Sequence, residues 1–416
     1  MTDISSVPRD DAAERLRQLD KTAAVLWPGA QRVRQRGPGR PDELLIGPSA
    51  RLPRVLLPAA DPRAAATALV AQGTGSSTPA RVQRRALAAA TRLGLAPWLM
   101  PDRLRPDPAQ QSIVNHLTNV LGRPVVISTP LSAARANRKP VLQLLDARGD
   151  TLGWAKIAVD DLTGRLVEHE TNILTALART SGLPFRPPDV VHVGTWHGRP
   201  FVVLSPLPTT GAGRVAEAAL TSAMRALAET PIPSRDSGPS YVHSLGAQID
   251  ALLGEAGPED GAPLAELREA LTELRAAIEA AALPTGTWHG DWTPWNCRQR
   301  DADVLVWDWE RCVGGVPLGF DPLHYRMQEA LIARGTPHPV AARDCIAEAP
   351  RTLAAWSMPA DAARLTAALY LTELALRYVR DGQRAAGGYG GQVELWIVPA
   401  VREYASFAKP NMRGTR

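Results

Sequence analysis

A short segment between Gly286 and Gly319 carries the side chains whose types and spacing are best suited to chemistry. Asp291 and Asn296 lie five residues apart in a stretch rich in turn-forming residues, and Asp308 follows twelve residues later at the end of an apolar run. Such an arrangement can bring three oxygen-bearing side chains to one place. Hard oxygen donors in that number suit magnesium, which keeps water and nucleotide phosphates as its other ligands. The segment therefore predicts a metal and phosphate site.

Two other interpretations of this segment are weaker. His289 and Asp291 alone would be typical of a capped loop without chemistry, but the addition of Asn296 and Asp308 favours a site. A hydrolase metal centre built on His289, Asp291 and Asp308 would need further histidine ligands. The chain offers no His-rich cluster to supply them, so the magnesium interpretation is preferred.

The order of these residues resembles a known enzyme family. The pattern His-Gly-Asp, four residues, Asn at 289–296, with a later Asp-Trp-Glu at 308–310, is similar to that of the aminoglycoside phosphotransferase and choline kinase-like family, distant relatives of protein kinases. The resemblance covers roughly Ile113 to Tyr404. Trp292 and Trp295 depart from it, because the family more often has smaller or aliphatic residues there.

The resemblance implies a role for each residue of the motif. Asp291 would be the catalytic residue that orients the acceptor hydroxyl and takes its proton, while Asn296 and Asp308 would hold Mg²⁺ on the phosphates of ATP. His289 would brace the loop. Asp321 matches a second aspartate of the family, which supports the catalytic loop without reacting, so it is not expected to be catalytic.

The resemblance also requires a lysine on the third strand of a small lobe and a glutamate on the next helix, which together hold the α- and β-phosphates. Lys156 lies inside the strand-like run 154–159, and only four of the 47 basic residues are lysines. Glu170 has the helical spacing relative to the apolar residues after it that places its carboxylate on the inward face. A solvated surface pair worth under about 1 kcal/mol is the alternative, but the downstream motif favours nucleotide binding.

Two further segments are expected to contact the nucleotide. The adenine edge should meet the segment that joins the lobes, residues 204–207, where Ser205 and Leu207 are the predicted contacts. The phosphates should lie under the loop of residues 128–140, which contains no glycine. The hydroxyl candidates for this loop are Ser128, Thr129 and Ser132.

The elements that must position these residues follow from the periodicity of apolar side chains. The middle third reads as three strands, a helix and two strands, and the chain beyond Pro208 turns helical. The predicted class is α+β. Together with the resemblance this gives a protein-kinase-like two-lobed fold, with a small antiparallel-sheet lobe, a mostly helical large lobe and an N-terminal extension. The expected strands are 125–128, 141–146, 152–159, 190–195 and 200–204, and the expected helices are 164–180, 214–229, 241–254, 263–282 and 360–380.

The expected domains are an N-terminal extension of unknown role at 1–108, a nucleotide-binding lobe at 109–207 and a catalytic and substrate lobe at 208–416. The extension is irregular and rich in Arg and Pro, with apolar runs at 43–46 and 54–57. Alanine-rich helical stretches follow Asp61 and Thr78, and a Gly/Ser/Thr-rich loop is expected between them.

Composition excludes several functional classes. The chain has 416 residues, is 45% hydrophobic and can bury a large core. No apolar run approaches the roughly 18 to 20 residues of a membrane span, and the first twenty residues are charged, so a cytoplasmic location without membrane contact is expected. The net charge of +5 is spread over the chain, which does not indicate nucleic-acid binding. The three cysteines have no metal-ligand spacing, and the oligomeric state is open.

The acceptor is expected to be a hydroxyl of a small molecule such as an aminoglycoside, an amino sugar or a related metabolite. Residues 214–279 hold eleven acidic residues against five arginines, which would favour a cationic acceptor, although a solvated helical surface explains the same charges. The alternatives are a kinase that acts on Ser or Thr of a biosynthetic peptide and a catalytically silent, kinase-like nucleotide-binding protein.

Overall fold

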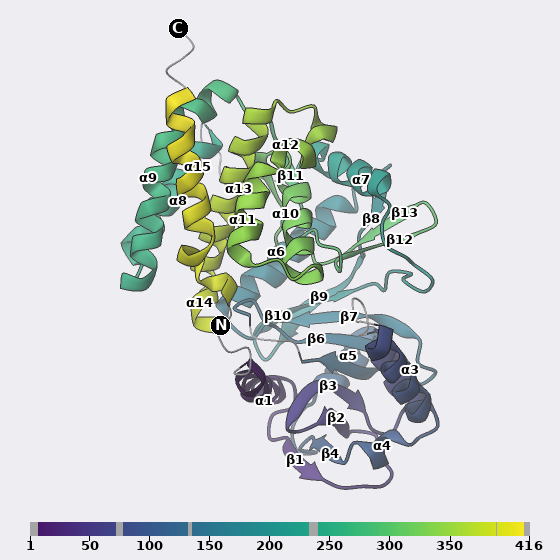
Figure 1. Cartoon of the computed structure of the whole chain (residues 1–416). Helices are drawn as coiled ribbons and strands as arrows, with labels where there is room; N and C mark the ends of the chain where they lie inside the picture. Colours follow the sequence, from purple (N-terminus) through teal and green to yellow (C-terminus); the bar gives the residue numbers. More distant parts are fainter. Residues whose placement is uncertain (1–6, 72–77, 132–134, 233–239, 388, 412–416) are drawn as a thin grey trace. The chain divides into compact units, whose positions relative to one another are not determined.

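The chain forms two compact units, which we call the sheet unit and the helical unit. The sheet unit comprises Met1–Thr171 and Pro188–Pro206, and the helical unit comprises Asn172–Pro187 and Leu207–Arg416. The computed structural model describes residues 7–71, 78–131, 135–232, 240–387 and 389–411. Figure 1 labels their elements.

One antiparallel sheet of nine strands forms the centre of the sheet unit. In spatial order its strands are β1 (Gln31–Arg34), β4 (Asp102–Arg105), β2 (Leu44–Ser49), β3 (Leu52–Pro58), β5 (Val126–Pro130), β6 (Val141–Leu145), β7 (Thr151–Ile157), β10 (Arg199–Leu204) and β9 (Val190–Trp196). The four strands of the predicted extension therefore continue the sheet of the predicted small lobe, joined where Leu56 of β3 pairs with Thr129 of β5. The predicted boundary near residue 108 falls inside this unit.

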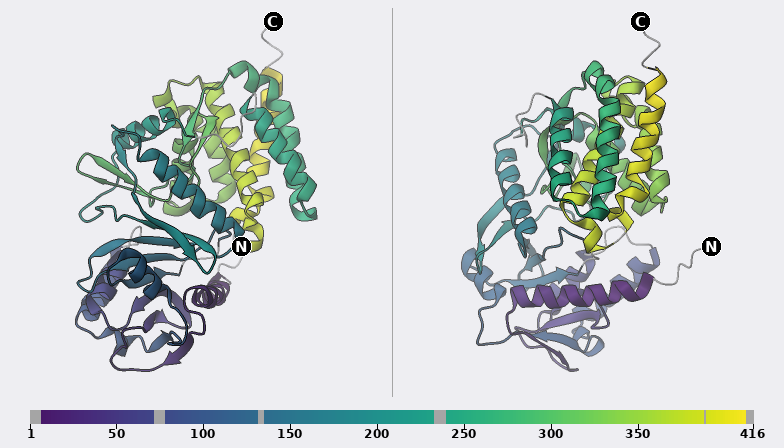
Figure 2. Two further views of the ribbon diagram at one scale, coloured as in Figure 1. Left: turned by 180° about the vertical axis from the view of Figure 1, so that it is seen from behind. Right: turned by 90° about the vertical axis from the view of Figure 1, so that its left-hand side faces the viewer.

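Helices cover the sheet and complete its core. They are α1 (Val7–Leu26), α2 (Pro62–Ala71), α3 (Thr78–Arg92), α4 (Ala96–Leu99), α5 (Ile113–Leu121) and α6 (Asp161–Leu177), whose last residues belong to the helical unit. Helix α1 packs against β3, and Figure 2 shows it lying across the strands of this unit. One apolar core contains Leu26, Ile46 and Leu56 together with Leu144 and Phe201, so both halves of the sheet share it.

The helical unit surrounds two small sheets with helices. Strand β11 (Thr285–Trp288) pairs with β14 (Val313–Pro317), and β13 (Asp303–Val306) lies between β12 (Cys297–Arg300) and β8 (Phe185–Arg186). The longer helices are α7 (Glu217–Glu229), α8 (Tyr241–Glu255), α9 (Pro258–Ala281), α10 (Phe320–Gln328), α11 (His338–Ala347), α13 (Ala360–Arg380) and α15 (Ile397–Asn411). The short ones are α12 (Ala349–Thr352), α14 (Gln383–Ala386) and the turns at Glu329–Ala333, Ala354–Trp356, Tyr389–Gly391 and Val393–Leu395. Helix α9 packs between α8 and α15 (Figure 2).

The predicted α+β class is confirmed, and most elements of the middle third lie where periodicity placed them. Helix α6 begins earlier than predicted because Asp160 and Thr163 cap it: the Thr163 N–H donates to Asp160 Oδ1 and the Asp160 N–H donates to Thr163 Oγ1. Helix α7 begins later because Gly213 is hydrogen bonded to the backbone of Gln299. Helix α1 and strands β1 and β4 were not predicted, and most of the predicted loop before Thr78 lies outside the described residues.

Among the helices that the structure describes, none combines the length and apolar character needed to cross a membrane.

Candidate functional site

A tight turn after β11 presents the motif residues, and it depends on glycine. Gly290 has φ +81°, and a Cβ there would lie 2.4 Å from the carbonyl oxygen of Arg311. Buried Asp321 accepts hydrogen bonds from the backbone N–H groups of His289 (2.8 Å) and Gly290 (3.2 Å). Arg377 Nη1 donates to the Gly290 carbonyl at 2.6 Å. Hydrogen bonds thus hold the turn both at its backbone N–H groups and at its carbonyl oxygen.

The Asp291 carboxylate follows this turn and is fixed by two side chains. Asn296 Nδ2 donates to Asp291 Oδ2 at 2.8 Å and to the Asp291 carbonyl at 3.0 Å. His324 Nε2 lies 3.2 Å from Asp291 Oδ1. The Asp291 side chain nevertheless remains 33% exposed. The Asp291 carboxylate is thus fixed by hydrogen bonds but still accessible to a substrate.

A β-hairpin brings Asn296 and Asp308 toward each other. Asn296 directly precedes β12, and Asp308 lies two residues beyond β13, whose Val306 is paired with Cys297. The Trp307 N–H donates to the Asn296 carbonyl at 3.1 Å. Asp308 has φ +73°, a conformation that aspartate tolerates better than most residues. Two of the three predicted oxygen-bearing side chains thus flank one hairpin, and Asn296 connects them to Asp291.

Burial shifts the pKa values of the two groups that support the turn. Desolvation lowers the pKa of His289 to about 4, against the opposing charges of Asp291 and Asp308. Desolvation also raises the pKa of Asp321 to about 7, although the backbone N–H groups of His289 and Gly290 oppose this shift. His289 is therefore neutral near pH 7. Its Nδ1 accepts a hydrogen bond from the Asp291 N–H at 3.2 Å, which suits the bracing role predicted for it.

The sheet unit contains the predicted ion pair. Lys156 Nζ lies 2.7 Å from Glu170 Oε1, and the two side chains are 9% and 0% exposed. Lys156 lies on an inner strand of the sheet, opposite Val141 of β6 and Val202 of β10. This is a buried pair, so the alternative of a solvated surface pair is wrong.

The hydroxyl residues predicted to bind phosphate are placed differently. Ser128 is buried in β5, where its Oγ donates to the Leu56 carbonyl at 2.8 Å. This bond uses the hydroxyl proton to join the two halves of the sheet, so Ser128 does not suit a phosphate contact. Thr129 is also buried in β5, and Ser132 lies outside the described residues.

The predicted adenine contacts lie at the end of the sheet unit and the start of the helical unit. The Ser205 N–H donates to the Asp189 carbonyl, and its Oγ accepts from the Asp189 N–H, both at 2.8 Å. The Leu207 carbonyl accepts from the Thr209 N–H at 2.8 Å. Ser205 belongs to the sheet unit and Leu207 to the helical unit, so the connection runs through Pro206.

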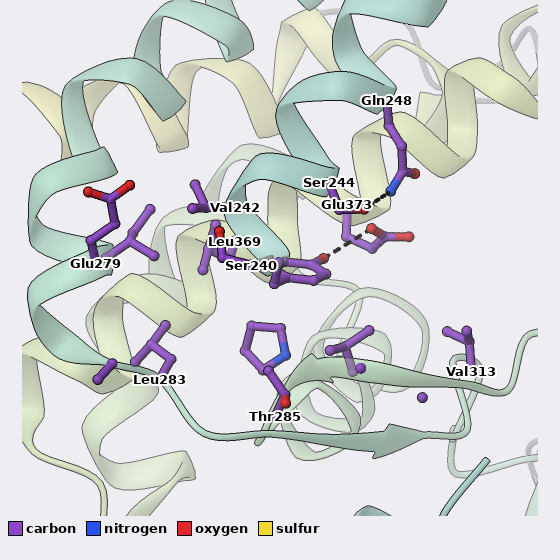
Figure 3. A pocket seen from close by; sticks show the side chains of 17 residues that line it. Ser240, Val242, Ser244, Gln248, Glu279, Leu283, Thr285, Val313, Leu369 and Glu373 are labelled. Carbon is purple, nitrogen blue, oxygen red and sulfur yellow. Dashed lines mark hydrogen bonds between the residues drawn. The ribbon is translucent and has the colours of Figure 1, made fainter. Parts of the chain in front are cut away.

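The helical unit also contains a cavity of about 590 Å³ between α8, α9, α13 and β14. Figure 3 shows Ser244, Gln248 and Glu373 gathered at one end of it and Glu279 with Leu283 at the other. The Tyr241 hydroxyl donates to Glu373 at 3.0 Å. The other polar residues of the lining are Ser240 and Thr285, and its apolar residues include Val242, Ile278, Val313, Val316, Pro317 and Leu369.

Sequence reasoning missed His324, whose contact with Asp291 comes from a helix outside the motif. His324 and Asp321 both lie on α10, three residues apart and so on neighbouring positions of one face. That spacing was the available signal, because a helix that places Asp321 under the turn brings His324 to the same loop. Arg377, which donates to Gly290, had no local signal.

Comparisons with known proteins agree with the motif. A model of the phosphotransferase enzyme family (APH) matches residues 156–318, the stretch that contains Lys156, Glu170, Asp291, Asn296 and Asp308. No curated protein matches the sequence.

Several solved structures are similar to the chain at low identity. One is an apo thermostable mutant of aminoglycoside phosphotransferase APH(4)-Ia, with 13% identity, a TM-score of 0.48 and coverage of 70% of this chain and 99% of that one. Another is a putative fructosamine-3-kinase from Haemophilus somnus 129PT, with 15% identity, a TM-score of 0.45 and coverage of 70% and 96%. A third is Plasmodium vivax ethanolamine kinase, with 9% identity, a TM-score of 0.44 and coverage of 83% and 94%. The family match confirms the resemblance predicted from the motif: this chain is a phosphotransferase, and residues 156–318 are the part that the phosphotransferase enzyme family describes.

Proposed function

We propose that this protein transfers the γ-phosphoryl group of ATP to a hydroxyl of a small molecule, with Asp291 as the residue that orients the hydroxyl and takes its proton. The observation that carries the proposal is the setting of Asp291. Asn296 and His324 fix its carboxylate by hydrogen bonds, yet 33% of the side chain is exposed. A base for an incoming hydroxyl needs both properties.

The proposed reaction is a direct transfer. The acceptor oxygen bonds to the γ-phosphorus as the bond between that phosphorus and the β–γ bridging oxygen breaks, and ADP leaves with the electron pair. The hydroxyl proton passes to the Asp291 carboxylate. Asn296 donates to Oδ2 and His324 to Oδ1, and each carboxylate oxygen can accept more than one hydrogen bond, so the acceptor hydroxyl can bind without displacing either donor.

The donor sets fit a magnesium nucleotide. Asn296 uses its amide nitrogen on Asp291, so its amide oxygen would be the atom to bind a metal, and Asp308 would supply a carboxylate oxygen. Bound Mg²⁺ would neutralise the charge of the phosphate oxygens. Lys156, held by Glu170, would bind the α- and β-phosphates. Backbone groups of Ser205 and Leu207 that are not already hydrogen bonded would contact the adenine edge. Ser128 has no role in the proposed nucleotide site.

The cavity of the helical unit is the proposed acceptor site. Its Val313 is paired with Trp288, three residues before Asp291, so the cavity reaches the strand that leads into the catalytic turn. Glu279 and Glu373 give its lining two carboxylates beside apolar side chains and hydroxyls. Carboxylates in a lining favour cationic ligands. We therefore propose an acceptor that carries an amine, such as an aminoglycoside, an amino sugar or a related metabolite.

The test is a transfer assay with labelled ATP against amine-bearing alcohols, neutral sugars and Ser/Thr peptides, with a magnesium-dependent thermal shift in parallel. Asp291→Asn should lower turnover at least about 100-fold and keep the nucleotide-induced shift. Lys156→Met should reduce that shift. Transfer to peptides alone would replace the small-molecule assignment, and a nucleotide shift without transfer to any acceptor would indicate a silent binding protein. The absence of any nucleotide shift in the wild type would end the proposal.

A further inference from the structure

A buried histidine and a buried tyrosine form a hydrogen-bonded chain that ends on Asp291. His324 Nε2 lies 3.2 Å from Asp291 Oδ1, and His324 Nδ1 lies 2.9 Å from the Tyr370 hydroxyl. The His324 side chain is 2% exposed and Tyr370 is fully buried. They come from α10 and α13, which pack together in the helical unit (Figure 1). The family match ends at residue 318, before either residue.

The chemistry of the three groups fixes the direction of both hydrogen bonds. An ionised carboxylate only accepts, so His324 Nε2 must carry a proton and donate to Asp291. Burial lowers the pKa of His324, although the Asp291 carboxylate opposes this shift, and burial raises the pKa of Tyr370 well above its ordinary value. Both groups are therefore neutral near pH 7. The unprotonated Nδ1 of His324 then accepts from the Tyr370 hydroxyl, so the Asp291 carboxylate selects the Nε2–H tautomer and Tyr370 binds the other ring nitrogen.

This chain completes the restraint on the Asp291 carboxylate. Asn296 binds Oδ2 from within the motif, and His324 binds Oδ1 from a helix 33 residues away in sequence. With Asn296 alone, the carboxylate could pivot about its bond to the Asn296 amide. With both donors, the plane of the carboxylate is fixed. A carboxylate that acts as a base must point one of its oxygens at the proton that it accepts, and small misplacements lower rates strongly.

We propose that His324 and Tyr370 are positioning residues for Asp291: Tyr370 holds the His324 ring through Nδ1, and His324 fixes the Asp291 carboxylate for proton abstraction from the acceptor. The inference rests on the proposed function of Asp291. Both side chains are buried and neither is assigned a contact with acceptor or nucleotide, so their loss should lower kcat and leave nucleotide affinity unchanged.

Four variants of the full-length chain test the kinetic part, each first verified as folded by circular dichroism and thermal unfolding. His324→Leu removes the donor at similar volume and should lower kcat about 10- to 100-fold with the KM for ATP unchanged. His324→Gln should restore most of the loss, because its amide nitrogen can occupy the Nε2 position. Tyr370→Phe should lower kcat by a few fold. Tyr325→Phe removes the hydroxyl of another buried tyrosine of the same unit, one that bonds to Arg214 instead, and it should leave kcat unchanged.

The tautomer provides a readout that needs no activity. In ¹⁵N-histidine-labelled protein, His324 is assigned by the signal lost in His324→Gln. It should show the Nε2–H form both in the wild type and in Tyr370→Phe, and the Nδ1 signal should shift in Tyr370→Phe because that nitrogen loses its donor. A wild-type Nδ1–H form would overturn the inference, as would wild-type kcat in a folded His324→Leu. If no acceptor is ever phosphorylated, the proposed function fails, while the tautomer still decides whether this chain of hydrogen bonds exists.

Discussion

The two units assemble their proposed functional groups in different ways. In the helical unit, Asp291, Asn296 and Asp308 come from one stretch of 18 residues, which a glycine turn and one hairpin fold together. In the sheet unit, Lys156 depends on a nine-stranded sheet whose first four strands come from the first 108 residues. The spacing of residues in a short motif fixes its geometry, whereas the position of a strand in a sheet depends on partner strands that lie far away in sequence. The predictions below test this contrast, from the largest effect to the smallest.

Deletion of residues 1–108 should prevent the rest of the chain from folding. The deletion would remove α1 and β1 to β4, expose the β5 edge and open the apolar core that Leu26 and Ile46 share with Leu144 and Phe201. The Trp196 Nε1, which donates to the Val25 carbonyl at 2.7 Å, would also lose its acceptor. Soluble yield and circular dichroism measure the effect.

A shorter deletion, of residues 1–30, should destabilise the protein less. It removes α1 and leaves the nine strands, so it should give a soluble but less stable protein. If residues 109–416 instead gave a soluble protein with a cooperative melt and a nucleotide-induced shift, the first 108 residues would be a separable extension, and the contrast between the units would be lost.

Gly290→Ala should cause a large loss from a single methyl group. The new Cβ would meet the Arg311 carbonyl at 2.4 Å in a backbone with φ +81°, so the turn must move or strain. We expect a loss of about 3–4 kcal/mol of unfolding free energy and a fall in kcat of at least about 100-fold. Urea denaturation and transfer assays measure the two effects.

Gly261→Ala is the matched control, because Gly261 lies in α9 with nothing within 4 Å of an added Cβ. There the same change should stabilise the protein by about 0.5–1 kcal/mol. Wild-type stability and kcat in Gly290→Ala would show that the turn does not need its glycine.

The parts of the site that could be predicted from the sequence are those fixed by short-range chemistry. The turn, Asp291 and Asn296 follow from residues at fixed spacing, and the Lys156–Glu170 pair follows from one strand and the next helix. The contacts of His324 and Arg377 could not be predicted, because they depend on how α10 and α13 pack on the turn. Ser128 was misplaced for the same reason: its local pattern fits a phosphate-facing loop, but its partner is Leu56, 72 residues away.

His289→Gln should uncover opposing pH dependences beneath the catalytic turn. Between pH 4 and 6.5, the folded protein keeps His289 neutral while the unfolded chain binds a proton there, so His289 makes the unfolding free energy rise with pH. Asp321 acts in the opposite sense, since the folded carboxyl keeps its proton to about pH 7 and the unfolded one releases it near 3.8. In the wild type the two contributions largely cancel.

Urea denaturation from pH 4 to 8 checks this balance. The destabilisation of His289→Gln relative to the wild type should grow by about 3 kcal/mol as the pH rises to 6.5 and stay constant above that. Asp321→Asn should show the opposite trend, with a destabilisation that shrinks as the pH rises toward 7. Curves that run parallel to the wild type at every pH would mean that burial perturbs neither group.

Ser128→Ala should have the smallest effect and distinguishes the two roles of that residue. The change leaves the Leu56 carbonyl without its donor in a buried position, which should cost about 1–2 kcal/mol of unfolding free energy. The KM for ATP should not change, because the hydroxyl joins β5 to β3 rather than facing phosphate. Ser406→Ala removes a similar bond to a carbonyl, that of Arg402 on the exposed face of α15, and should change stability by no more than about 0.5 kcal/mol. A raised KM for ATP with unchanged stability in Ser128→Ala would indicate that this serine binds phosphate. The two halves of the sheet would then be joined by backbone pairing alone.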